Sequence, residues 1–260
     1  MNFQYILATF IEALKGVPTT LLISFVALIV SLPFGLFLAL FRLKKVPFLS
    51  QLARLYTLII RGTPLILLIL MFYSFFPSFL NALFKENGIG IDIFKVNPLF
   101  YACIVFLLVS TASVAEIFRS GLSAINPGQF EAGYAVGLSS FHIYRRIILP
   151  QVFVSALPNI CNLAITLVKG TSLVFVMTVK DITAIAKIQA SYGYNYAESY
   201  LVIFVIYIII CSLIQFIFKK IEQRLAINRQ YSQVNSNEKE KVTDQVVSEK
   251  GKGWLNVKYP

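Results

Sequence analysis

The chain has 260 residues, of which 57% are hydrophobic and only 13% are charged. A soluble domain carries about a quarter charged residues, so this composition excludes a soluble globular protein and indicates a polytopic membrane protein. The formal net charge of +11 would suggest nucleic acid as the partner of a soluble chain. Here the basic residues cluster at the ends of apolar runs, and that pattern excludes a nucleic-acid-binding protein.

The amino-terminal residues 1–16 are mildly amphipathic and no basic segment precedes them. We therefore predict a helix that lies at the membrane interface and not a cleavable signal peptide. Residues 19–41 then form an uncharged run that is long enough to cross about 30 Å of hydrocarbon. Because this first span ends in Arg42, Lys44 and Lys45, its end is predicted to be cytoplasmic and the amino terminus to be outside.

Four more spans are predicted from the apolar runs that follow. A helix over 48–60 enters the membrane, and Gly62 and Pro64 break it before the second span. Together with the first, these spans make an all-α protein with about five transmembrane helices. The predicted limits of the later spans are about 65–76, 98–118, 150–168 and 201–218.

The distribution of basic residues tests this topology. Eleven of them fall on the predicted inner side: Arg42, Lys44, Lys45, Arg54, Arg61, Arg119, Arg145, Arg146, Lys219, Lys220 and Arg224. Six fall on the predicted outer side: Lys15, Lys85, Lys95, Lys169, Lys180 and Lys187. The excess has the sign expected for five spans with the carboxyl terminus inside. We predict a transmembrane domain over 17–226, followed by a polar, disordered cytoplasmic tail over 227–260.

Residues 169–172, with the sequence KGTS, interrupt the fourth span. Non-helical backbone at membrane depth is tolerated only where it is buried or lines a water-filled cavity. One interpretation is that Thr171 and Ser172 line a substrate path. The other is that the span simply ends there and an external loop begins.

The three cysteines, Cys103, Cys161 and Cys211, each lie inside an apolar segment and are not clustered. They resemble small buried hydrophobic residues, so no disulfide or metal site is predicted.

The polar loop over 120–150 carries the most specific motif in the chain. Its spacing E-A-A-x3-G-x9-I-x-L-P falls on Glu131, Ala132, Gly133, Gly137, Ile147, Leu149 and Pro150, with Gly133 in place of the second Ala. The pattern predicts two short helices joined at a bend at Gly137, with Pro150 in the first turn of the next helix. This spacing resembles the cytoplasmic coupling loop of ABC importer permeases. The alternative is an ordinary juxtamembrane loop whose Arg145 and Arg146 face lipid headgroups.

Further segments narrow the resemblance. The chain resembles the polar amino acid ABC permeases over residues 16–226, through RGTPL (61–65), AEIFRSG (115–121), GQFEAG (128–133), RRIILPQ (145–151), ALPN (156–159) and TSL (171–173). AEIFRSG and GYNYAESY are most similar to the cystine-importing branch. The chain departs from the usual LKDTSL pattern at Gly170, which stands where that family has an acidic residue.

The resemblance implies a type I ABC importer permease fold in the plasma membrane of a bacterium. It implies a subunit that is not an enzyme and that imports an amino acid, with L-cystine as the leading candidate. A second permease copy or a paralogue, two ATPase subunits docked on the 131–150 loops and an extracellular substrate-binding protein are the implied partners. The chain has no G-x4-G-K-[ST] loop, so ATP and Mg are expected on the ATPase and no cofactor in this chain.

Two other classes of protein are alternatives to this one. An intramembrane enzyme is disfavoured because His142 is the only histidine and the spans contain no catalytic or metal-ligand cluster. An ion-coupled secondary transporter is the alternative that stays open, with Glu116 as its proton site. Glu116 either contacts substrate together with Thr171 and Ser172 or pairs with Arg119 one helical turn away. The sequence leaves open which amino acid is carried, whether the permease pairs with itself, and the role of the tail.

Overall fold

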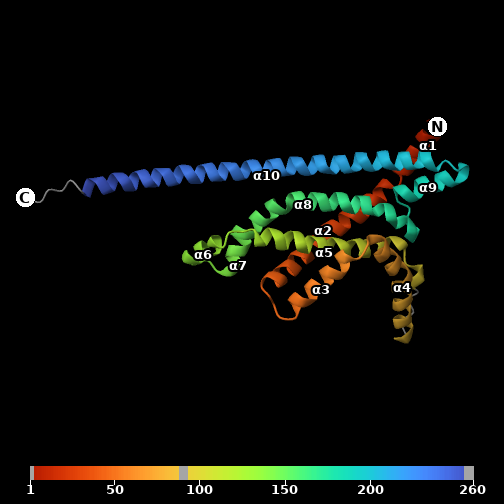
Figure 1. The fold of residues 1–260 in the computed structure, drawn as a ribbon, viewed down its shortest axis with the longest axis horizontal. Coiled ribbons are helices and arrows are strands. Elements are labelled where there is room, and N and C mark those ends of the chain that lie inside the picture. Colours follow the sequence, from red (N-terminus) through yellow and green to blue (C-terminus); the bar gives the residue numbers. More distant parts are fainter. Residues whose placement is uncertain (1–2, 88–92, 255–260) are drawn as a thin grey trace, which may run out of the picture. The chain divides into compact units, whose positions relative to one another are not determined.

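The computed structural model describes residues 3–87 and 93–254, with side chains up to residue 225. Within these residues all regular secondary structure is helical (Figure 1). The elements are α1 (Phe3–Leu14), α2 (Val17–Leu43), α3 (Leu49–Gly62), α4 (Leu65–Glu86), η1 (Ile93–Lys95), α5 (Pro98–Ser123), α6 (Gly128–Ala135), α7 (Ser140–Ile143), η2 (Tyr144–Ile148), α8 (Leu149–Gly170), η3 (Thr171–Met177), α9 (Ile182–Gly193) and α10 (Tyr196–Trp254).

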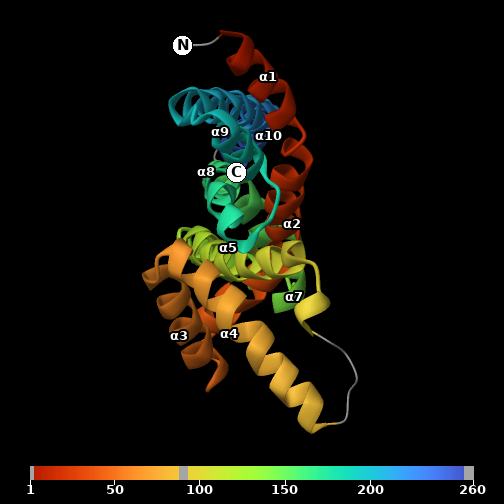
Figure 2. The ribbon, with the colours of Figure 1, turned by 90° about the vertical axis from the view of Figure 1, so that its right-hand side faces the viewer.

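Five stretches of the described chain are long and apolar enough to cross a membrane, which confirms the predicted all-α architecture. They are Phe3–Leu43, Leu65–Glu86, Pro98–Ser123, Ser140–Met177 and Tyr196–Leu225. Helix α5 lies between α3 and α4 on one side and α8 and α9 on the other, in both Figure 1 and Figure 2. The side of the membrane on which each terminus lies stays a prediction.

Two sequence predictions concern helix α1 and the carboxyl-terminal residues. Helix α1 packs on α9 and leaves Phe3, Leu7 and Ile11 more than half exposed. Its place at the membrane interface stays a prediction.

Residues 217–260 form a unit separate from 1–216. The backbone in this unit continues α10 to Trp254, where the sequence predicts disorder, and residues 255–260 lie outside the described part. Since a polar helix without a packing face is marginal in water, the disordered tail stays a prediction.

The RGTPL segment separates α3 from α4. Thr63 has an extended backbone, with φ −99° and ψ 132°. The residue before a proline is sterically driven out of the helical region, so Pro64 ends α3 at Gly62 and α4 begins at Leu65. The predicted break is therefore confirmed, and it lets α3 and α4 run in different directions (Figure 2).

Helices α2 and α5 approach each other closely through small residues. A Cβ on Gly35 would lie 2.5 Å from Val114 Cγ1 and 2.9 Å from the backbone N of Ala115. One turn away, the Ser31 and Ser110 hydroxyls form a buried hydrogen bond of 2.7 Å. Small residues and interhelical hydroxyl contacts are how helices associate in lipid, so this crossing holds the first and third spans together.

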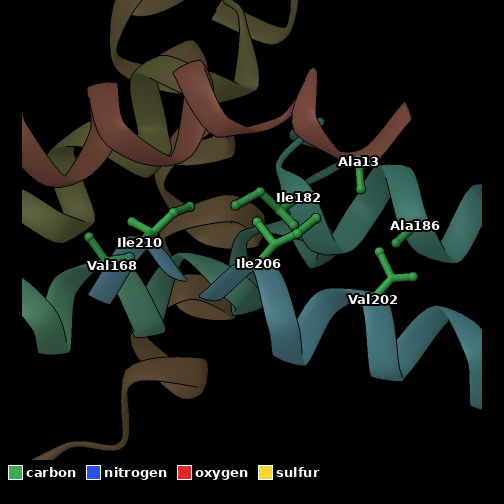
Figure 3. Packing of buried hydrophobic residues seen from close by; sticks show 7 residues of the cluster. All are labelled: Ala13, Val168, Ile182, Ala186, Val202, Ile206 and Ile210. Atoms are coloured by element: carbon green, nitrogen blue, oxygen red, sulfur yellow. The ribbon is translucent and has the colours of Figure 1, made fainter. Parts of the chain in front are cut away.

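A second packing centre joins helices from both ends of the chain. It is a buried aliphatic cluster drawn from α1, α8, α9 and α10 (Figure 3). Its members are Ala13, Val168, Ile182, Ala186, Val202, Ile206 and Ile210. Because these residues are separated by up to nearly two hundred positions, the cluster fixes α1 and α9 against the fifth span.

Many large apolar side chains on the spans remain exposed. Phe25 of α2, Phe75 of α4 and Phe204 of α10 are between 64% and 71% exposed. A soluble protein rarely leaves so much contiguous apolar surface in water, whereas lipid or a second membrane subunit would cover it. The exposed side chains therefore agree with a membrane environment for these helices.

Candidate functional site

The predicted loop folds as two short helices with a sharp bend between them. Helix α6 ends in a Schellman cap, in which the Gly137 N–H donates to the Tyr134 carbonyl at 2.9 Å and the Leu138 N–H donates to the Gly133 carbonyl at 3.0 Å. Gly137 adopts φ +78°, a left-handed conformation that favours glycine. The bend at Gly137 is as predicted, and its cause is backbone conformation, since a Cβ there would meet no atom within 4 Å.

Gly133 occupies the place where α6 and α7 touch. It is buried, and a Cβ on it would lie 2.7 Å from Ile143 Cγ1. In the sequence, Gly133 stands in place of the second Ala of the motif. In this chain the missing methyl leaves the space that the Ile143 side chain occupies.

The second half of the loop continues directly into α8. Pro150 lies at the start of α8, as expected, but the chain is already helical before it. Proline has no N–H to give to the carbonyl four residues earlier. The turn over Tyr144–Ile148 widens accordingly, with the Leu149 N–H reaching back to the Tyr144 carbonyl. Ile147 and Leu149 are half-buried here, and Ile148 is fully buried.

Polar and aromatic contacts fasten the loop to the spans. The Lys44 ammonium at the end of α2 lies 5.1 Å from the centre of the Tyr144 ring. That ring packs edge-on against Phe130 of α6, with centroids 5.3 Å apart. Gln151 of α8 donates a 2.6 Å hydrogen bond to the Gln129 side chain. The loop is therefore anchored to α2 and α8.

The tip of the loop presents apolar side chains outward. Tyr134, Val136 and Phe141 are 53%, 75% and 65% exposed. Glu131 and Ala132 are also exposed, and Glu131 lies in the first turn of α6, where a negative charge favours the helix dipole. An exposed apolar patch on a fixed polar loop is the composition of a protein-docking surface.

Glu116 is held by two arginines from different helices. Its Oε1 accepts from Arg119 Nη2 at 2.5 Å and from Arg119 Nε at 3.0 Å. Its Oε2 accepts from Arg42 Nη1 of α2 at 2.9 Å. The sequence suggested the Arg119 pair but missed Arg42, which lies 74 positions away. A carboxylate engaged by two cations is poorly suited to carry a proton across the membrane, so the geometry disfavours the ion-coupled alternative.

Thr171 and Ser172 lie where α8 changes into the tighter helix η3. The Thr171 hydroxyl is fully buried and donates to the Val168 carbonyl at 2.7 Å. The Ser172 hydroxyl donates to the Lys169 carbonyl, also at 2.7 Å. Both hydroxyls thus close the end of α8, and neither lines the cavity that contains Glu116. The three candidate substrate-path residues do not form one contact cluster in the described part of the chain.

Asp181 is a buried acidic residue that the sequence interpretation did not single out. Its carboxylate is fully buried and caps α9, accepting from the Thr183 N–H at 3.1 Å and from the Ala184 N–H at 2.8 Å. The Tyr207 hydroxyl of α10 donates to the same carboxylate at 3.3 Å. Burial raises the pKa of the Asp181 carboxyl above its ordinary value. The signal available in the sequence was Asp181 directly before a helical run, which is an N-cap pattern.

Five apolar spans and an anchored two-helix loop with an exposed apolar tip are the features of a multi-pass membrane protein with a docking surface for a partner. The chain belongs to the family described as binding-protein-dependent transport system inner membrane component, whose model matches residues 31–227. It is therefore a permease subunit of an ABC importer in the plasma membrane. Membership in this family implies an ATPase and a substrate-binding protein as partners.

Individual relatives place the chain among amino acid permeases. It is 34% identical to the L-cystine transport system permease protein TcyL of Bacillus subtilis (strain 168), over 82% of this chain and 86% of that protein. It is also 34% identical to the nopaline transport system permease protein NocM of Agrobacterium fabrum, over 81% of this chain and 86% of the relative.

A solved structure confirms the predicted type I importer fold. The crystal structure of an amino acid ABC transporter with histidines matches with a TM-score of 0.73 and 28% identity. The match covers 86% of this chain and 99% of that one.

Proposed function

We propose that this permease imports L-cystine, driven by ATP that a separate ATPase subunit binds with Mg and hydrolyses. The similarity to TcyL and the AEIFRSG and GYNYAESY segments support cystine. NocM is equally similar, so overall identity alone does not select the substrate. This chain holds no nucleotide site of its own in the proposal. It pairs with a second permease, either another copy or a paralogue, and receives substrate from the extracellular binding protein.

The coupling of ATP hydrolysis to transport is assigned to the 131–150 loop. The observation that carries this assignment is the exposed apolar tip on a loop that is rigidly capped at Gly137 and anchored to α2 and α8. A docked ATPase that closes on ATP would displace this tip and, through its anchors, the spans. Such a loop biases a two-state equilibrium between inward-facing and outward-facing forms.

Glu116 is assigned a structural role within this mechanism. Arg42 joins α2 to Glu116 of α5, and Arg119 holds the same carboxylate from within α5. A carboxylate in such a pair has little capacity left for the ammonium group of a substrate. Thr171 and Ser172 remain candidates for the substrate path through the lone pairs of their hydroxyls and through backbone groups at the end of α8, because each hydroxyl already donates its proton to a backbone carbonyl.

Reconstitution tests the proposal directly. Proteoliposomes would contain the permease with its ATPase, with ATP inside and the binding protein and radiolabelled cystine outside. We expect cystine uptake that requires both ATP and the binding protein, and weak competition by glutamine, arginine and nopaline. Uptake of one competitor in preference to cystine would refute cystine as the substrate. Uptake without ATP, driven by an ion gradient, would refute the ATP-driven mechanism.

A further inference from the structure

A cavity of about 690 Å³ lies between α2, α3 and α5, close to the coupling loop. The cavity is close to the loop because Arg42 lines it. Arg42 is two residues before Lys44, and Lys44 contacts Tyr144 of the loop. Its walls are formed by Arg42, Gln51, Arg54, Leu55, Thr57, Leu58, Arg61, Gly62 and Glu116. The mechanism proposed above uses none of the α3 residues in this set.

The charges around the cavity do not balance. Three arginines and one glutamate line it, which leaves a net charge of +2 (three minus one). The glutamate is Glu116, which is already shared between Arg42 and Arg119. In residues 3–87 and 93–225, Arg54 and Arg61 have no carboxylate partner within 4.0 Å. The Nε of Arg42 is buried and has no hydrogen-bond partner in the same residues. The cavity therefore has unused donors and an excess of positive charge.

The α3 wall alternates these cations with apolar side chains. Arg54, Leu58 and Arg61 follow the i, i+4, i+7 spacing of a single helical face, and Leu55 lies three residues before Leu58 on the same side. Arg54 and Arg61 are two turns apart, about 10 Å along the axis. Leu55 and Leu58 between them are 54% and 71% exposed. A ligand that suits this face has an anionic group for the arginines and an apolar part for the leucines.

We propose that this cavity binds an oxyanion, the phosphate of an anionic phospholipid of the leaflet nearest the coupling loop. Guanidinium groups recognise phosphate and carboxylate oxygens by paired hydrogen bonds. Basic pockets between membrane-spanning helices bind anionic headgroups, and each cation near the surface contributes to that affinity. The exposed leucines favour a lipid because its acyl chains can cover them. The carboxylate of a free amino acid has the same anionic chemistry but offers less apolar surface.

Lipid titration of the assembled permease and ATPase tests this site. The complex is stripped of lipid in detergent, and binding of phosphatidylglycerol and phosphatidylcholine is measured by native mass spectrometry. The test variant is Arg54→Gln with Arg61→Gln. The control is Lys219→Gln with Arg224→Gln, which removes the same charge from exposed positions outside the cavity. We expect the wild type and the control to prefer phosphatidylglycerol, and the test variant to bind it roughly thirtyfold more weakly, about fivefold for each arginine lost.

Two results would overturn the proposal. Equal binding of both lipids by the wild type would show that no anionic site exists, and equal weakening in the two double variants would show a general charge effect. Competition identifies the source of the anion. If cystine or inorganic phosphate binds in an Arg54- and Arg61-dependent manner while phosphatidylglycerol does not, the occupant is a free anion and the lipid is excluded. These outcomes do not depend on which substrate is transported.

Discussion

Replacing Gly137 by valine tests whether the carboxyl-terminal cap of α6 is needed to couple ATP hydrolysis to transport. An L-residue in the left-handed region costs about 1–2 kcal/mol, and a β-branched residue lies at the upper end. Because a Cβ at this position meets no atom within 4 Å, the whole penalty comes from φ +78° and none from crowding within the subunit. A penalty of about 2 kcal/mol shifts the equilibrium between capped and uncapped loop roughly thirtyfold toward the uncapped form.

We expect Gly137→Val to reach the membrane at close to the wild-type level and to assemble with the ATPase. Cystine transported per ATP hydrolysed should fall roughly tenfold, because the tip is no longer held in one orientation. The assay is uptake and phosphate release measured in the same proteoliposomes. Gly137→Asn is the matched control, since asparagine tolerates the left-handed region at small cost and is larger than alanine.

Two outcomes would refute this reasoning. Wild-type coupling in Gly137→Val would remove the cap from the mechanism. A loss in Gly137→Asn as large as in Gly137→Val would show that side-chain bulk against the ATPase matters and that the backbone conformation does not.

Three other predictions follow from the same structure. Gly35→Val should lower the thermal stability of the detergent-purified protein by about 1–3 kcal/mol, because its side chain would overlap α5; an unchanged melting curve would contradict the close contact. Glu116→Gln should reduce copurification with the ATPase while uptake per assembled complex stays constant, whereas normal assembly with weakened uptake would favour substrate contact. Cysteines introduced at Asn87 and Ser140, after removal of the three native cysteines, should react with an impermeant thiol reagent from opposite sides of the membrane. Labelling of both from outside would contradict the five-span topology.

The sequence predicted those features of the fold that depend on neighbouring residues. Apolar run length located the spans, and the steric effect of Pro64 located the break between α3 and α4. The spacing around Gly137 predicted the loop bend, and the three-residue spacing gave the pair of Glu116 with Arg119 as one of two interpretations. Each of these depends on geometry within a few turns of one helix.

What the sequence could not predict depends on contacts between distant segments. Arg42 reaches Glu116 only because α2 and α5 cross at small residues, which no local pattern reports. Asp181 is a charged residue that no local pattern marks as buried, but packing around α9 buries it completely. One of the two sequence interpretations placed Thr171 and Ser172 on a substrate path, and in the structure both hydroxyls donate to backbone carbonyls of α8.

Helix α2 is held by contacts at both of its ends. It therefore links the end of the protein that carries the coupling loop to the end where α9 begins. At one end, Arg42 and Lys44 join it to α5 and to the coupling loop. At the other end, Gly16 lies so close to the backbone of Asp181 and Ile182 that a Cβ would sit 2.4–2.7 Å from them. The helix spans 27 residues, a length of about 40 Å. A movement of the loop that preserves these contacts therefore also moves the start of α9. This connection runs along α2 and does not involve the fourth and fifth spans.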